Sequence, residues 1–137
     1  QMCIRDRTAL SRTNYDTATE MVGVMLSPDG TSKAQTEKLR MKTTNWATRI
    51  HRSPLDELAV WTALRHTITK TIEYPLAAST LSKEQLTYVM APAFNVALPR
   101  ANIPKSFPRA VIYGPTSAQG LGLTDPFYSN NADIFKI

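Results

Sequence analysis

Residues 32–52 place apolar and basic side chains in two rows at helical spacing. At about 100° per residue, one row falls within an arc of about 80°. It comprises Lys38, Lys42, Asn45, Arg49 and Arg52. The second row lies about 100° further round the helix and comprises Leu39, Thr43, Trp46 and Ile50. This pattern predicts a helix that docks on a core with one side and presents cations on the neighbouring side.

The basic row has two interpretations at this stage. A row of Lys and Arg suits a helix that lies along a nucleic-acid backbone, because such affinity comes mainly from neutralising phosphates. Basic helix faces are also common as ordinary solvated surfaces. The two tryptophans, Trp46 and Trp61, fit apolar faces, and we expect them to anchor the core rather than to stack on bases.

A second helix is expected to begin at Ser53 and Pro54. Serine is a favoured N-cap, and proline is favoured at the first helical position. The acids Asp56 and Glu57 would then lie at the positive end of the helix dipole. Helical spacing of apolar residues continues to Ile72, and Pro75 should end the helix.

A third helix is expected to begin at Ser82. Ser82 and Gln85 have the spacing of a capping box, and Leu81 and Leu86 have that of a hydrophobic staple. Pro92 should kink or restart this helix, because its ring removes a hydrogen bond in mid-helix.

Short β elements are expected on either side of the helices. The apolar run 20–26 predicts a strand or hairpin, and the Ser-Pro-Asp-Gly sequence at 27–30 predicts a turn. Residues 111–113 and 120–123 predict two short C-terminal strands. The fold class is therefore mainly α with minor β: a three-helix bundle flanked by a short N-terminal β-hairpin or strand and by short C-terminal strands.

The net charge of +5 and the pI near 9.6 point toward acidic partners. The span 33–70 holds eight Lys and Arg against three acids, so it accounts for the whole net charge. No apolar run approaches the roughly 18 residues of a membrane span, and nothing reads as a secretory signal. We expect an intracellular protein, nuclear or cytoplasmic, with no membrane contact.

Reactive groups are sparse in the sequence. Two-metal catalysis needs clustered carboxylates, and the adjacent acids Asp56 and Glu57 suit a helix start better. The single Cys3 excludes an internal disulfide and a cysteine-based zinc site, and His51 and His66 have no plausible ligand set around them. We expect no catalytic residue, no metal and no cofactor in this chain.

Several strings, taken in order, resemble a known family. Residues 21–30, MVGVMLSPDG, resemble the segment that follows the polymerase core in reverse transcriptases of non-LTR-type retroelements. Residues 46–50, 63–65 and 72–76 look like the thumb helices that follow it. Residues 98–103, 107–109, 112–115 and 120–123 resemble the region beyond the thumb. The set is similar to retroelement open reading frames of protists and algae, and it covers residues 19–125.

The resemblance implies an RNA-directed DNA polymerase whose magnesium ions sit on aspartates of the palm. Those aspartates should lie upstream, in a Tyr-x-Asp-Asp hairpin, and no Asp-Asp pair occurs in this sequence. The implied role is to grip an RNA/DNA primer–template duplex, next to the missing palm and fingers of the same polypeptide, without enzyme activity of its own. The phosphate contacts would be Lys38, Lys42, Arg49 and Arg52, with Arg65, Lys70 and Arg109 extending the surface. Magnesium is implied for the parent polymerase and not for this chain.

On this interpretation the chain divides into four segments. Residues 1–7, QMCIRDR, resemble a translated sequencing adapter, and residues 8–30 form the end of the palm with the primer-grip hairpin. Residues 31–99 form the thumb-like bundle, and residues 100–137 form a truncated post-thumb segment. The alternative is a stand-alone basic helical module that binds nucleic acid or an acidic protein.

Overall fold

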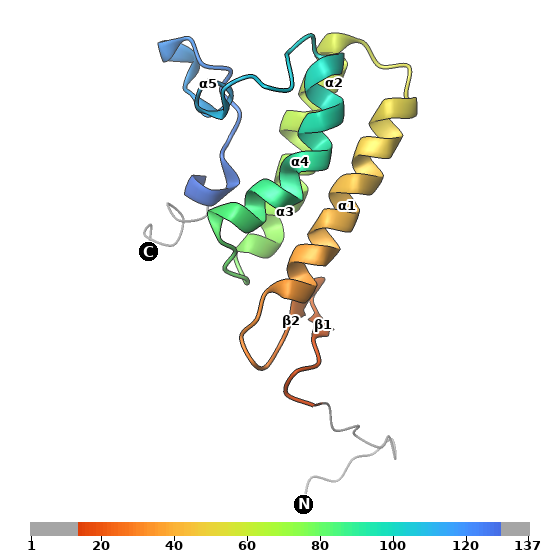
Figure 1. Cartoon of the computed structure of the whole chain (residues 1–137), viewed down its shortest axis with the longest axis vertical. Helices are drawn as coiled ribbons and strands as arrows, with labels where there is room; N and C mark the ends of the chain where they lie inside the picture. The colour runs from red at the N-terminus through yellow and green to blue at the C-terminus, as the bar shows by residue number, and fades with distance from the viewer. Residues whose placement is uncertain (1–13, 130–137) are drawn as a thin grey trace, which may run out of the picture.

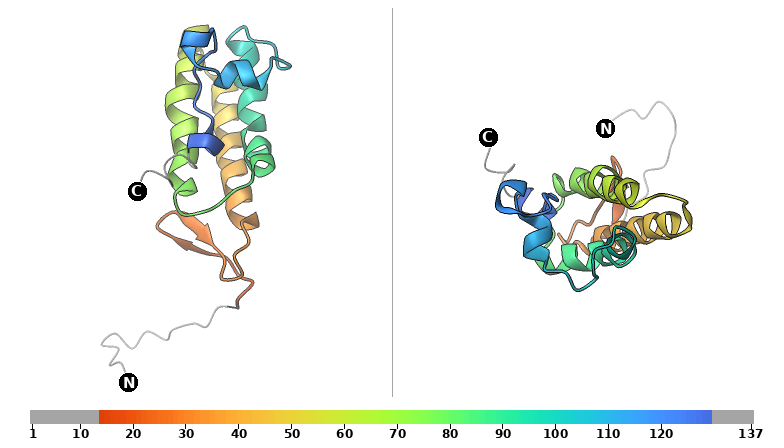
Figure 2. Two further views of the ribbon diagram at one scale, coloured as in Figure 1. Left: turned by 90° about the vertical axis from the view of Figure 1, so that its left-hand side faces the viewer. Right: turned by 90° about the horizontal axis from the view of Figure 1, so that it is seen from above.

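The computed structural model describes residues 14–129. The expectations for residues 1–7 and for the chain end at 130–137 lie outside the described residues. Three long helical rods run side by side, up, down and up again, with a small hairpin at one end and the C-terminal segment along one side (Figures 1 and 2). The expected three-helix, mainly α architecture with an N-terminal hairpin is confirmed.

The hairpin consists of β1 (Thr19–Met21) and β2 (Val24–Leu26), paired antiparallel. Its two-residue loop, Val22 and Gly23, has positive φ at both positions (51° and 82°), as in the type I′ turn that fits the twist of a hairpin. The expected turn after it is confirmed, since the Gly30 N–H donates to the Ser27 carbonyl over 3.0 Å. This turn leads the chain into the first helix.

Helix α1 (Lys33–Arg52) matches its prediction closely. It packs against α4 along its length, and Gln35 ties it to the hairpin by accepting the Met25 N–H over 2.7 Å. The helix ends at Ser53, whose backbone is extended before Pro54.

The second rod is one continuous run of three elements: α2 (Glu57–Ala63), a π-helical turn η1 (Leu64–Ile68) and α3 (Thr69–Leu76). Its predicted start at Ser53 is wrong. Asp56 is the N-cap instead, accepting the Ala59 N–H over 2.8 Å, whereas the Ser53 hydroxyl donates to the Ile50 carbonyl and so finishes α1. A buried threonine follows the π turn directly. The Thr69 hydroxyl donates to the Leu64 carbonyl five residues back, which matches the i→i+5 spacing of a π-helix.

Helix α4 (Lys83–Arg100) begins with the predicted capping box. The Ser82 hydroxyl accepts the Gln85 N–H over 3.2 Å, and the Gln85 side chain accepts the Ser82 N–H over 2.9 Å. The expected restart at Pro92 is wrong, because a single helix runs on to Arg100. Residues on both sides of Pro92 pack into the core, and this packing holds the helix together across the missing hydrogen bond.

The two predicted C-terminal strands are wrong. Residues 111–113 belong to a short helix, α5 (Arg109–Tyr113), and residues 120–123 follow the 3₁₀ turn η2 (Thr116–Ala118) without regular structure. The two stretches still lie side by side, since the Leu123 N–H donates to the Ile112 carbonyl over 3.0 Å. Both of these side chains are buried, so the apolar pattern was set by core packing and not by a strand period.

The core lies between the three rods and extends under the C-terminal segment. Its fully buried members include Leu39 from α1, Ile72 from α3 and Leu98 from α4. Ile112 and Leu123 add the C-terminal segment to the same cluster. The α5 segment lies on the side of α4 away from α1, as both views show (Figures 1 and 2). Helix α1 and the C-terminal segment therefore lie on different sides of α4.

Candidate nucleic-acid interface

The basic row and the apolar row of α1 lie in different environments, as their spacing predicts. Leu39 and Thr43 have no exposed surface and Ile50 is 7% exposed, so this side of the helix is in the core. Lys42, Asn45, Arg49 and Arg52 are exposed on the neighbouring side. Within residues 14–129, the three cations of this group have no ion pair with an acid.

We call Lys42, Arg49 and Arg52 the open cations of α1. They span ten residues, which is about 15 Å of helix axis. One strand of a duplex has a phosphate about every 3.4 Å along the duplex axis, so this length faces about four phosphates. The arrangement can neutralise a phosphate backbone.

Lys38 belongs to the same row but is engaged within the protein. Its Nζ lies 2.7 Å from Glu20 Oε1 and 2.8 Å from the Gly23 carbonyl oxygen, and its side chain is only 23% exposed. The hydrogen bond from Lys38, together with its charge, lowers the pKa of the Glu20 carboxyl. Lys38 therefore holds the hairpin against α1, and its charge is already partly neutralised.

Trp46 lies at the edge between the two rows. Its indole N–H donates to the Thr67 hydroxyl over 2.9 Å, and its ring packs against the core. This agrees with the expected anchoring role. Lys42 and Arg49 lie about 40° and 60° from Trp46 on the same side of the helix. Both therefore lie beside the contact between α1 and the second rod.

Arg65 and Lys70 do not extend the open cations. Thr67 faces α1 through Trp46, and Arg65, two residues earlier, is turned by about 160° away from that side. The Lys70 ammonium pairs with Glu73 over 2.8 Å on its own helix. The structure therefore brings neither residue into the row.

Arg109 lies on the opposite side of the bundle. Its guanidinium stacks over the ring of Phe94 on α4, 4.4 Å from the ring centroid. This contact gives Arg109 a packing role against α4. Helix α5 lies on the side of α4 away from α1, so Arg109 is not part of the row on α1 (Figure 2).

Two further arginines serve internal contacts that the sequence pattern does not reveal. Arg40 stacks over Tyr88 at 4.3 Å and donates to the Tyr88 carbonyl, which joins α1 to α4. Arg100 donates to the carbonyls of Ile50 and Leu55, so it satisfies the end of α1 and the loop after it. Neither could be found from helical spacing, since each partner lies 45 to 50 residues away in the sequence.

The hairpin tip forms an exposed apolar cluster near Lys38 that charge analysis also misses. Met21 is 57% exposed and Val22 is 84% exposed. Tyr74, 65% exposed, lies beside them with its hydroxyl 3.5 Å from the Val22 carbonyl oxygen. The sequence feature that marks this exposed tip is Val22, a β-branched residue directly before Gly23 in the hairpin turn.

Comparisons with known proteins give no relative. No protein-family model matches the chain, and neither the curated proteins nor the solved structures contain a significant match. Among the described residues, no helix is long and apolar enough to cross a bilayer. The same residues bring no three His, Cys, Asp or Glu side chains together as a metal-binding group.

Proposed function

We propose that α1 binds the phosphate backbone of a nucleic-acid duplex through Lys42, Arg49 and Arg52. The observation that supports this most directly is the contrast along one helix. Leu39 and Ile50 are held in the core, while the three open cations stand on the adjacent exposed flank. Because packing already fixes the backbone of this helix, only the side chains of the cations lose freedom on binding.

The contacts available on this flank determine the kind of recognition. Lys and Arg on phosphates position a protein on a duplex but do not read its sequence. Three neutralised phosphates give a salt dependence of about −2.7 in log K against log salt. We therefore expect weak, sequence-independent binding that decreases steeply as the salt concentration increases.

We further propose that this surface is the duplex-gripping thumb of a retroelement RNA-directed DNA polymerase. The order of a hairpin, a turn and then a helical bundle with a basic flank is what the sequence resemblance implies for that region. On this proposal the chain holds the primer–template duplex, and the reaction takes place on aspartates contributed by another part of the polypeptide.

Fluorescence anisotropy with a labelled RNA–DNA hybrid tests the binding proposal. The triple variant Lys42→Gln, Arg49→Gln, Arg52→Gln should flatten the salt slope by about 2.7 units. The matched control removes three exposed charges elsewhere: Lys33→Gln, Arg65→Gln and Lys105→Gln. We expect the control to keep the slope of the wild-type chain, and equal slopes for the two triple variants would refute the proposal.

The polymerase proposal has a separate test. Reading the coding sequence upstream of Thr8 should reveal a fingers–palm region with paired aspartates. A stop codon followed by a start codon close to Thr8 would contradict it. Duplex binding together with that second result would favour the stand-alone basic module.

A further inference from the structure

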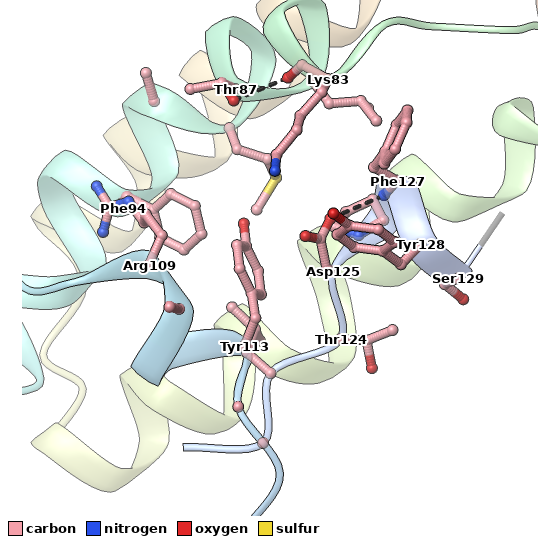
Figure 3. Close-up of a pocket in the computed structure, with 18 of the residues that line it drawn as sticks. Lys83, Thr87, Phe94, Arg109, Tyr113, Thr124, Asp125, Phe127, Tyr128 and Ser129 are labelled. Atoms are coloured by element: carbon pink, nitrogen blue, oxygen red, sulfur yellow. Dashed lines mark hydrogen bonds between the residues drawn. The ribbon is translucent and has the colours of Figure 1, made fainter. Parts of the chain in front are cut away.

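A cavity of about 880 Å³ lies between α4, α5 and the segment 122–129, on the side of α4 away from α1 (Figures 1 and 3). Aromatic rings from three separate parts of the chain surround it: Phe94, Tyr113, Phe127 and Tyr128. Drug-sized ligands bind in cavities of about 300–1,000 Å³ with mostly apolar and aromatic walls. The cavity is therefore large enough for a small molecule.

One stripe of α4 forms the long wall. Lys83, Thr87, Met90 and Phe94 follow one another at spacings of four, three and four residues, which places them on a single face. Phe94 lies eleven positions after Lys83, which corresponds to about 16 Å of helix. Met90 and Leu123 are each 2% exposed and close the cavity toward the core.

Three hydrogen-bond donors face this apolar space. Figure 3 shows the Tyr113 hydroxyl and the Lys83 ammonium pointing into the cavity, with Arg109 at its edge beside Phe94. The Tyr113 hydroxyl is not among the fully buried unpaired polar atoms of residues 14–129, so it remains open to the cavity that Tyr113 lines. A phenol is protonated at neutral pH and can donate a hydrogen bond. Burial, and then the nearby Asp125 carboxylate, raise the pKa of Tyr113 to about 12, which extends this range further into alkaline pH.

The charges around the cavity favour an anion. Lys83 and Arg109 contribute two positive charges, and Asp125 contributes one negative charge. Asp125 Oδ1 also accepts the Phe127 N–H over 3.0 Å, so part of its acceptor capacity is used within its own loop. The net charge of the lining is therefore positive.

We propose that this cavity binds a small molecule with a flat aromatic body and one anionic group. The aromatic body packs between the rings and the apolar face of α4. The anionic group takes hydrogen bonds from Tyr113 and from the side chains of Lys83 and Arg109. Hydrogen bonds from a charged donor to a carboxylate, sulfonate or phosphate are roughly twice as strong as hydrogen bonds between neutral groups.

The test uses two dyes of nearly the same shape on the full chain. 8-Anilinonaphthalene-1-sulfonate has a flat aromatic body and one sulfonate, and N-phenyl-1-naphthylamine has the same rings without the charge. We expect saturable binding of the anionic dye at one site per chain, at least about fivefold tighter than the neutral dye. Lys83→Gln and Arg109→Gln should each weaken the anionic dye by about fivefold and leave the neutral dye within about twofold.

Lys105→Gln is the matched control, because Lys105 is an exposed cation, four residues before Arg109, that does not line the cavity. It should leave both affinities unchanged. Tyr113→Phe removes only the hydroxyl and should weaken the anionic dye alone. Equal affinity for the two dyes, non-saturable binding, or an anionic-dye affinity that neither cation variant changes would each overturn the proposal.

Discussion

Lys38 and Arg49 belong to one predicted row, yet the structure separates their roles, and the salt dependence of duplex binding should show the difference. Arg49 is exposed, whereas Lys38 is paired with Glu20 at 2.7 Å. If only the open cations neutralise phosphates, the wild-type slope is about −2.7, and a fourfold increase in salt weakens binding by about 40-fold. Arg49→Gln lowers the slope to about −1.8, so the same increase weakens binding by only about 12-fold.

Lys38→Gln should behave differently from Arg49→Gln. It removes an internal ion pair and leaves the number of neutralised phosphates unchanged, so the slope stays near that of the wild-type chain. Affinity at any one salt concentration should decrease somewhat, because the freed Glu20 carboxylate then stands near Lys42.

The assay is fluorescence anisotropy of one labelled RNA–DNA hybrid from 50 to 200 mM salt, with the two single variants measured beside the wild-type chain. Circular dichroism should show the same helix content for all three. If Lys38→Gln flattens the slope as much as Arg49→Gln does, the Glu20 pair does not withhold Lys38 from the duplex, and our assignment of the open cations is wrong.

Three further predictions concern stability, measured by urea or thermal unfolding. Ser82→Ala removes the capping box and should cost about 1 kcal/mol, whereas Ser106→Ala, on an exposed turn, should have almost no effect. Gly120→Ala should cost about 2–3 kcal/mol, because its Cβ would lie 2.2 Å from the Gly114 carbonyl oxygen. Tyr113 ionises near pH 10 when unfolded and near 12 when folded, so its contribution is intact below pH 10 and is lost at about 1.4 kcal/mol per pH unit between 10 and 12. Tyr113→Phe should lack that part of the decline, and parallel pH profiles for the two chains would contradict the shift.

Local signals in the sequence predicted much of the helical framework. The capping box at Ser82 and Gln85 needs only residues three apart, and it fixed the start of α4 correctly. Ser53 has an equally good cap signal, but the end of α1 uses its hydroxyl, so the next helix starts at Asp56. A cap prediction fails where two neighbouring elements compete for one side chain, because the signal itself does not say which helix it serves.

The C-terminal segment shows a different limit. Three apolar residues at 111–113 are too few to distinguish a strand period from a helical one. Contacts far along the chain decide the outcome: Ile112 and Leu123 are both buried, and Gly120 approaches the Gly114 backbone so closely that no side chain fits. The cavity next to this segment could not be predicted either, because its lining combines α4 with residues about thirty positions later.

The exposed flank of α1 was predictable from spacing, but whether each cation pairs with an acid was not. Helical geometry places Lys38 and Lys42 together, yet the hairpin delivers Glu20, 18 residues away, to Lys38 alone. The sequence contains Glu20 but does not show the hairpin that brings it next to Lys38. The binding surface is thereby limited to the part of α1 that lies beyond the hairpin.

Lys42 is the residue that best separates duplex binding from an ordinary role in helix stability. Arg49 and Arg52 lie in the last turn of α1, where cations interact favourably with the helix dipole by about 0.3–1 kcal/mol, so stability alone would account for their presence. Lys42 is in mid-helix, ten residues before the end, and the dipole gives no reason for a cation there. Lys42→Gln should therefore leave thermal stability unchanged and still flatten the salt slope by about 0.9 units. An unchanged slope with this variant would mean that the row is a solvated surface and that its two terminal arginines serve only the helix end.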